Sequence, residues 1–231
     1  MRVRGHVLMV AVAAVLAGAC SPPAGRVPAA QPESAVARVW PPPPAPARIR
    51  WIASVARPED VGLQPSFLRR VRDVLAGQEE EWFIRPTGVA ASGRRLYVAD
   101  PGAQALVIFD APAGRVRRVR DAGAQRLASP VAVTLGAGGR VYVVDSYLAK
   151  VFVYDAEGRL EASIGDPGFR RPSGVAYDLA RNRLYVADSA AHRVWIFSGD
   201  GRAVGTIGQR GTGRGEFNFP THVTVDRHGT L

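Results

Sequence analysis

A repeat of about 44 residues is the feature that most constrains how this 231-residue chain can fold. Each copy opens on a proline, and the four prolines stand 44, 42 and 48 residues apart, at Pro86, Pro130, Pro172 and Pro220. Short runs rich in Val, Ile, Tyr and Phe follow the first three, and Gly, Asp and Pro interrupt these runs. Such runs are typical of antiparallel strands, and this period corresponds to one supersecondary unit per repeat. The sequence therefore predicts four-stranded units, the blades of a β-propeller.

The third copy is the best preserved. It reads Pro-Ser-Gly-Val-Ala at 172–176, Leu-Tyr-Val-Ala-Asp at 184–188, His-Arg-Val-Trp-Ile-Phe at 192–197 and Asp-Gly-Arg at 200–202. Together with the copies that precede it, this pattern resembles the NHL repeats of six-bladed β-propellers, over about residues 82–231. The resemblance implies an all-β fold of NHL propeller type. It does not imply one function, because propellers carry many unrelated activities.

The fourth copy is shorter than the others. It begins at Phe219 and reaches Leu231, the position at which the second strand starts in the preceding copies. We therefore expect an incomplete, open arc of about 3.5 blades out of six, with one short N-terminal helix. Exposed strand edges in such an arc favour aggregation or swapping. We expect roughly 100 further residues, or another copy of the chain, to complete the ring.

The N-terminus has the features of an exported lipoprotein. Residues 1–19 combine a basic head with an apolar run too short to span a bilayer, which is typical of a signal peptide. Small residues before Cys20, the only cysteine, resemble a bacterial lipobox, although Leu16 stands four places before the cysteine and not three. The resemblance implies lipidation of Cys20. Residues 20–47 are rich in Pro and Ala and are expected to form an extended tether.

Residues 48–81 lie between the tether and the blades. Residues 49–55 alternate like a strand and resemble the fourth strand of a blade, so we expect them to close the last blade. Residues 65–77 place Phe67, Leu68, Val71, Val74 and Leu75 at helical spacing, with Ser66 as a candidate cap. This pattern predicts an amphipathic helix that packs on the propeller or, alternatively, binds a partner.

Three aspartates recur at a strand end in every complete copy: Asp100, Asp145 and Asp188. A short acceptor at this point can satisfy backbone donors in a turn, and we favour this interpretation. The alternative is a ring of carboxylates that binds calcium, which would require their oxygens to converge near the propeller axis.

No Ser-His-Asp, Cys-His or His-x-x-x-His arrangement is present in the sequence. His222 stands where the first and third copies have Gly88 and Gly174, at the start of an innermost strand. Its imidazole could act there as a metal ligand or base, or it could be held by a hydrogen bond at the strand start.

The chain carries a net charge of +10, and Lys150 is its only lysine. Four arginines fall within a candidate outer strand: Arg115, Arg117, Arg118 and Arg120. Such a concentration could bind an anionic lipid, a polysaccharide or an acidic protein; the alternative is a solvated face in an arginine-rich chain. An exported chain has no routine access to nucleic acid, so we expect no binding of that kind.

These observations favour a non-catalytic lipoprotein of the bacterial cell envelope that binds a protein or an anionic ligand and has no cofactor. Membrane attachment would run through Cys20. Ser21 after the cysteine resembles the usual sorting pattern for the outer membrane, which implies that the protein faces the periplasm if the source has two membranes. The alternative is a metal-dependent propeller enzyme, by resemblance to calcium-dependent lactonases and esterases or a zinc-dependent lyase, for which only His222 and the recurrent aspartates could supply ligands.

Overall fold

The computed structural model describes residues 38–63 and 82–231 of the chain. The chain divides into two units, Met1–Ala53 and Ser54–Leu231. In the first unit, β1 (Val39–Trp40) and β2 (Ile49–Arg50) pair as a small antiparallel hairpin. No helix among the described residues is long and apolar enough to cross a membrane.

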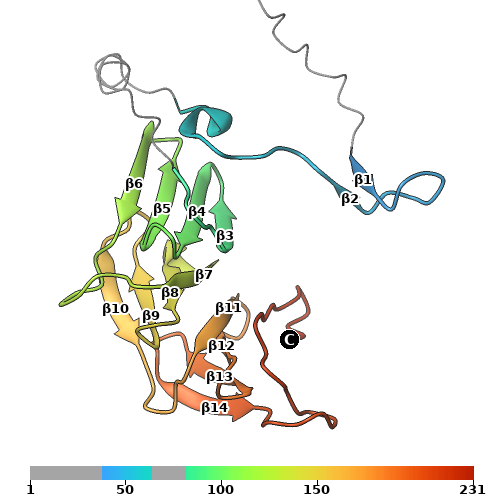
Figure 1. Ribbon diagram of the computed structural model, residues 1–231, viewed down its shortest axis with the longest axis vertical. Helices are drawn as coiled ribbons and strands as arrows, with labels where there is room; N and C mark the ends of the chain where they lie inside the picture. The colour runs from blue at the N-terminus through green and yellow to red at the C-terminus, as the bar shows by residue number, and fades with distance from the viewer. Residues whose placement is uncertain (1–37, 64–81) are drawn as a thin grey trace, which may run out of the picture. The chain divides into compact units, whose positions relative to one another are not determined.

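The second unit contains three four-stranded antiparallel sheets, each built from strands in sequence order (Figure 1). Blade 1 consists of β3 (Gly88–Ser92), β4 (Arg95–Asp100), β5 (Ala105–Asp110) and β6 (Arg115–Val119). Blade 2 consists of β7 (Pro130–Leu135), β8 (Val141–Asp145), β9 (Lys150–Tyr154) and β10 (Leu160–Ile164). Blade 3 consists of β11 (Pro172–Asp178), β12 (Arg183–Asp188), β13 (Arg193–Ser198) and β14 (Ala203–Ile207). The predicted all-β fold of repeated blades in an open arc is therefore confirmed.

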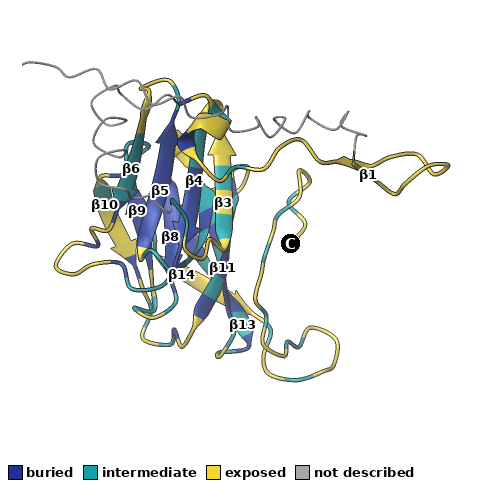
Figure 2. Ribbon diagram, turned by 45° about the horizontal axis from the view of Figure 1, so that its top comes forward, coloured by how far each residue is buried: buried dark blue, intermediate teal, exposed yellow. Residues whose placement is uncertain are grey.

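The blades stack through apolar faces, and blade 2 is covered on both sides. Alternate residues of its middle strands point to opposite faces. One set packs against Tyr97, Leu106 and Ile108 of blade 1, and the other packs against Leu184, Val186 and Phe197 of blade 3. Figure 2 shows β5, β8 and β9 as mostly buried, whereas β3 and β14 carry exposed residues. This double burial explains why β8 and β9 are apolar almost throughout.

The aromatic residues of the second and third strands contribute to these interfaces. Tyr97 and Tyr142 are 2% and 1% exposed. The Tyr97 hydroxyl donates a hydrogen bond to the Ala156 carbonyl of blade 2 at 3.2 Å. Tyr142 stacks on Tyr177 of blade 3 with ring centroids 5.2 Å apart. Burial, with the neighbouring Tyr177, raises the pKa of Tyr142 to about 12. The tyrosines thus join neighbouring blades.

The first face of blade 1 has no neighbouring blade among the described residues, and residues before the repeats cover it. Val98, Val107 and Phe109 pack there against Leu63, with Val61 and Phe83 alongside. Leu63 is 4% exposed and follows a 3₁₀ turn, Pro58–Val61, which ends on Gly62 in the left-handed conformation. A short segment outside the repeat therefore caps one end of the arc.

The structure describes only part of residues 48–81. Ile49–Arg50 does form a strand, but its partner in the structure is Val39–Trp40. The expected helix at 65–77 lies outside the described residues. The assignment of 48–81 as a closing strand and a helix therefore stays a prediction.

Residues 219–231, the fourth copy, form no regular strand, yet part of this segment lies where an inner strand would lie. A Cβ placed on Gly88 of β3 would come 2.9 Å from the Cα atom of Ala132. A Cβ on Gly174 of β11 would likewise come 2.9 Å from the Cα atom of His222. Residues 221–223 thus lie against β11 as residues 131–133 lie against β3. Gly88 and Gly174 leave no room for a Cβ because the next inner segment approaches so closely.

Each recurrent aspartate joins two loops at the same end of its blade. Both oxygens of Asp145 accept two backbone N–H groups, from Ala128 and Ser129 on one side and Tyr147 and Leu148 on the other, at 2.7–3.1 Å. Asp100 and Asp188 each accept three such bonds. All three side chains are fully buried. This is the turn role that the sequence favoured.

Replacing Gly158 by valine should destabilise the fold more than the same change at Gly114. Both glycines sit in the turn between a third and a fourth strand with positive φ, 81° and 62°, which costs a larger residue about 1–2 kcal/mol. A Cβ at Gly158 would also lie 2.6 Å from Val119 and 2.7 Å from Ile108 of blade 1, whereas one at Gly114 would meet nothing within 4 Å. We expect losses of about 3 kcal/mol and about 1 kcal/mol, which thermal unfolding measures; equal shifts would contradict this assignment.

Replacing Asp145 by alanine should remove about 3–5 kcal/mol of stability, because four backbone N–H groups lose their acceptor. Asp166→Ala is the matched control, since this aspartate accepts one local bond, from Gly168, and should cost less than about 1 kcal/mol. Urea unfolding gives both values.

A chelator should leave the unfolding of the wild-type protein unchanged. A marked loss of stability on chelation would instead indicate that the carboxylates hold a metal.

Candidate functional site

The four arginines of the candidate binding cluster lie on or just after β6, the outer edge of blade 1. Pairing with β5 places Arg115 opposite Asp110 and Arg117 opposite Ile108. Arg118 lies opposite Val107, and because side chains alternate along a strand it points to the other face. The structure therefore groups Arg115 and Arg117 on one face of the strand and separates Arg118 from them.

Two of these arginines have partners within blade 1 or next to it. The Arg118 guanidinium lies over the Trp82 ring, 4.8 Å from its centroid. The Arg120 Nε donates a hydrogen bond to the Ala103 carbonyl at 3.3 Å. Arg115 and Arg120 are exposed, whereas Arg117 and Arg118 are half-buried. Arg115 and Arg117 are thus the two arginines that the strand presents together.

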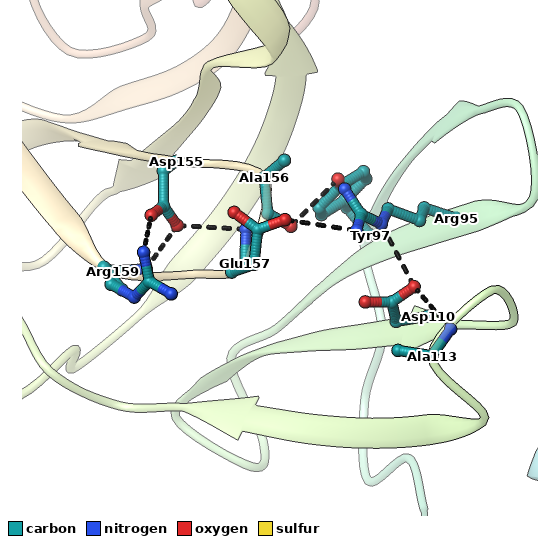
Figure 3. Close-up of polar contacts among 8 residues, drawn as sticks. All are labelled: Arg95, Tyr97, Asp110, Ala113, Asp155, Ala156, Glu157 and Arg159. Carbon is teal, nitrogen blue, oxygen red and sulfur yellow. Dashed lines mark hydrogen bonds and ion pairs between the residues drawn. The ribbon is translucent and has the colours of Figure 1, made fainter.

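Arg95, close to this cluster in the sequence, joins blade 1 to blade 2 (Figure 3). Its Nε lies 3.1 Å from an Asp110 oxygen, and its Nη2 lies 3.1 Å from a Glu157 oxygen. Burial acts to raise the pKa of Asp110, but hydrogen bonds from Arg95 and the Ala113 N–H, with the nearby charges of Arg95 and Arg115, outweigh it and hold that pKa below its usual value. Asp110 therefore stays anionic beside the arginines. Sequence spacing could not reveal this contact, because 62 residues separate Arg95 from Glu157.

In this structure the recurrent aspartates direct their oxygens at their own loops. A typical calcium site directs about six to eight oxygen ligands at one ion, yet the Asp145 oxygens already accept four N–H bonds from their own loops. Backbone N–H groups aimed at a carboxylate repel a cation in the same place. Within residues 38–63 and 82–231, no three His, Cys, Asp or Glu side chains form a group that could hold a metal ion.

His222 is exposed, and its Nδ1 lies 2.9 Å from the Thr221 hydroxyl. The sequence placed it correctly beside the inner strands, because its Cα atom lies against Gly174 of β11. Among the described residues, its side chain forms a hydrogen bond with the Thr221 hydroxyl and with no carboxylate or second histidine. The geometry therefore does not assemble a catalytic set around His222.

His192 has a role that the sequence did not indicate. It is 8% exposed, and its Nδ1 accepts a hydrogen bond from the Phe219 N–H at 3.2 Å. Its ring also packs on the Phe219 ring, with centroids 4.5 Å apart. The acceptor role requires an unprotonated Nδ1. His192 thus holds the start of the fourth copy against blade 3, a contact that no local motif signals.

In the propeller unit, the arginines along β6 thus form a concentrated cationic surface. Cys20, the predicted lipidation site, lies outside the described residues. An edge strand with exposed cations can pair with an extended anionic chain through its backbone and its side chains. The chemistry of this edge therefore suits the binding of an anionic ligand.

Comparisons with known proteins bear on the fold. Residues 169–197 match the family model described as NHL repeat. Comparison with curated proteins gives no match. These residues are the entry to blade 3 and its first three strands, the copy that the sequence showed to be best preserved.

Solved structures are similar at low sequence identity. Selenomethionine-substituted virginiamycin B lyase from Staphylococcus aureus has a TM-score of 0.52 and 13% identity, over 63% of this chain and 47% of that chain. Kuenenia stuttgartiensis hydrazine synthase has a TM-score of 0.51 and 19% identity, over 66% and 42%. A nidogen/laminin complex has a TM-score of 0.51 and 21% identity, over 62% and 53%. The chain therefore spans about half the length of the chains it resembles, and with them it shares a propeller-like fold, in which residues 169–197 match the NHL repeat.

Proposed function

We propose that this chain is an exported, lipid-anchored β-propeller of the bacterial cell envelope that acts as a non-catalytic scaffold and binds an anionic envelope component or a protein with an acidic segment. The sequence supports the anchor through its signal-like residues 1–19 and through Cys20. Ser21 favours the outer membrane, with the propeller in the periplasm. The fold supports a scaffold because its polar groups are largely used to hold the blades together.

The observation that carries the binding proposal is the contrast between three equivalent edge strands. β6, β10 and β14 are the outermost strands of their blades. Their sequences are RVRRV, LEASI and AVGTI. Only β6 concentrates cations, although all three edges have the same place in the fold. Structure alone does not require arginine at this edge, and a ligand of opposite charge would account for it.

The chemistry of β6 suits an extended ligand. The outer edge of a terminal strand presents backbone N–H and C=O groups at a regular spacing, and another extended chain can pair with them. Arg115 and Arg117 stand two residues apart on the same face. Arginine binds carboxylates, sulfates and phosphates through several N–H groups at once. An extended polymer with regularly spaced acidic groups would therefore match both features.

The alternative function is that of a metal-dependent hydrolase or lyase on the same fold. Its support is the exposed imidazole of His222, at a position where the neighbouring copies have Gly or Ala, together with the likeness of the fold to virginiamycin B lyase. The occupied oxygens of the recurrent aspartates argue against a shared metal site. Binding along β6 therefore remains the function that the geometry favours.

Replacing Cys20 by serine should release the protein from membranes, because serine lacks the thiol that would be acylated. Detergent phase partitioning of wild-type and variant protein measures the effect, with wild type expected in the detergent phase and the variant in the aqueous phase. If the two fractionate alike as aqueous protein, Cys20 does not anchor the chain.

Replacing Arg115 and Arg117 together by glutamine should weaken binding to a polyanion by about 3–10-fold, because each solvent-accessible charge contributes a few tenths to about 1 kcal/mol. Immobilised heparin is a suitable probe, and the salt concentration at elution is the readout. The matched control is Arg202→Gln with Arg210→Gln, which removes two exposed arginines elsewhere in the chain. Equal shifts for the two pairs would show that net charge alone governs binding.

A further inference from the structure

The hairpin of the first unit exposes an unusual combination of side chains. Trp40 and Trp51 are 49% and 42% exposed, and Ile49 and Ile52 are 65% and 83% exposed. Large apolar side chains grouped at this level of exposure indicate an interaction surface more often than a solvated one. Arg38, Arg48 and Arg50 lie among them, and the sequence contains no acidic residue between Arg38 and Glu59.

The hairpin is ordered by its own backbone, so the exposed side chains have defined faces. Trp40 pairs with Ile49, and Val39 pairs with Arg50. The Arg48 N–H donates to the Trp40 carbonyl, and the Trp51 N–H donates to the Arg38 carbonyl, each at 2.8 Å. Because side chains alternate along a strand, Trp40, Ile49 and Trp51 lie on one face, and Arg38 lies with them.

This face has the chemistry of a membrane-interface anchor. Tryptophan concentrates at the boundary between headgroups and acyl chains, where its ring is partly buried and its N–H stays in a polar layer. The Arg38 guanidinium lies over the Trp51 ring, 5.7 Å from the centroid. Arg50 pairs with Val39 and, like Arg48, lies on the opposite face of the hairpin from the tryptophans. The long side chains of these two arginines can extend around the edge of the hairpin to lipid headgroups while Trp40, Ile49 and Trp51 contact the bilayer. Arginines without neighbouring acidic residues favour an anionic surface.

We propose that the hairpin formed by residues 38–52 inserts Trp40, Ile49 and Trp51 into the interface of an anionic lipid bilayer, with Arg38, Arg48 and Arg50 on the headgroups. The proposal extends the proposed function, because an acylated Cys20 would place the hairpin near a bilayer. Eighteen residues along the chain separate Cys20 from Arg38, and even a fully extended segment of this length spans at most about 65 Å. The hairpin is thus a second membrane contact, which would restrict how far the propeller moves from its anchor.

Tryptophan quenching by brominated lipids tests this directly. The full chain carrying Cys20→Ser and a C-terminal histidine tag is held on vesicles by nickel-chelating lipids, so that attachment does not depend on acylation. One variant, Trp82→Phe with Trp195→Phe, retains the two hairpin tryptophans. The other, Trp40→Phe with Trp51→Phe, retains the two tryptophans of the propeller unit. Circular dichroism confirms that both variants fold.

On vesicles that contain phosphatidylglycerol, brominated acyl chains should quench the hairpin pair by more than half and leave the propeller pair almost unchanged. Replacing Arg38, Arg48 and Arg50 by glutamine should lower partitioning of the hairpin on the order of 100-fold and abolish the difference between the pairs. The control, glutamine at Arg202, Arg210 and Arg214, removes the same charge from exposed positions and should have no such effect.

Any of the following quenching results would overturn the proposal: no quenching of the hairpin pair, equal quenching of both pairs, or quenching on vesicles of phosphatidylcholine alone that equals the quenching on vesicles with phosphatidylglycerol. Protection of the hairpin tryptophans by an added polysaccharide or protein, without quenching by the lipid, would assign the surface to that partner and also overturn it. Failure of Cys20 acylation is detected separately, by detergent partitioning, and does not alter this readout.

Discussion

The stacking of one apolar sheet face on the next is the interaction on which the rest of this structure depends. A four-stranded sheet of this size has two apolar faces, and each must be removed from water. Burial of a large aliphatic or aromatic side chain contributes about 1.5–3 kcal/mol, and the interfaces of blade 2 bury many. Only blade 2 has a blade on both sides in the described residues. At blade 1, Leu63 and Phe83 provide the cover that a neighbouring blade would otherwise give.

The recurrent polar and small residues serve this stacking. An aspartate such as Asp145 joins the loop that enters a blade to the loop between its second and third strands. This contact fixes the position of the inner strand relative to the rest of its sheet. Arg95, with Asp110 and Glu157, makes a corresponding contact at the turn between a third and a fourth strand. These groups are buried or half-buried and internally paired. That is why they are poor candidates for chemistry on a substrate, whereas the arginines along β6 and the tryptophans of the hairpin still present surface to a partner.

Much of the fold could be predicted because a repeat shows the same physical requirement several times. The aspartates at the strand ends and the runs rich in Val, Ile, Tyr and Phe each recur in register, so a local pattern was enough to assign them. The contacts that escaped prediction join residues far apart in the sequence and occur once. Leu63 against Phe109, Arg95 with Glu157 and His192 with Phe219 have no period to reveal them, and the partner of Ile49–Arg50 depended on a proline-rich segment expected to be only a tether. Of the candidate site, the arginine-rich edge strand was foreseen, but its division between two faces required the register of β5 and β6.

The close approach at the recurrent glycine also sets the curvature of the arc. Sheets that radiate from an axis lie closest together at their innermost strands. The angle between neighbouring sheets therefore depends on how closely those inner strands approach one another. Gly88 and Gly174 have no side chain between one inner strand and the next, so the backbones of adjacent inner segments lie in van der Waals contact there. His222 occupies the corresponding position in the fourth copy. A strand packed beyond that residue would meet an imidazole where Gly88 and Gly174 present only a hydrogen atom and Ala132 a methyl group. The spacing between inner strands would therefore be wider at that blade.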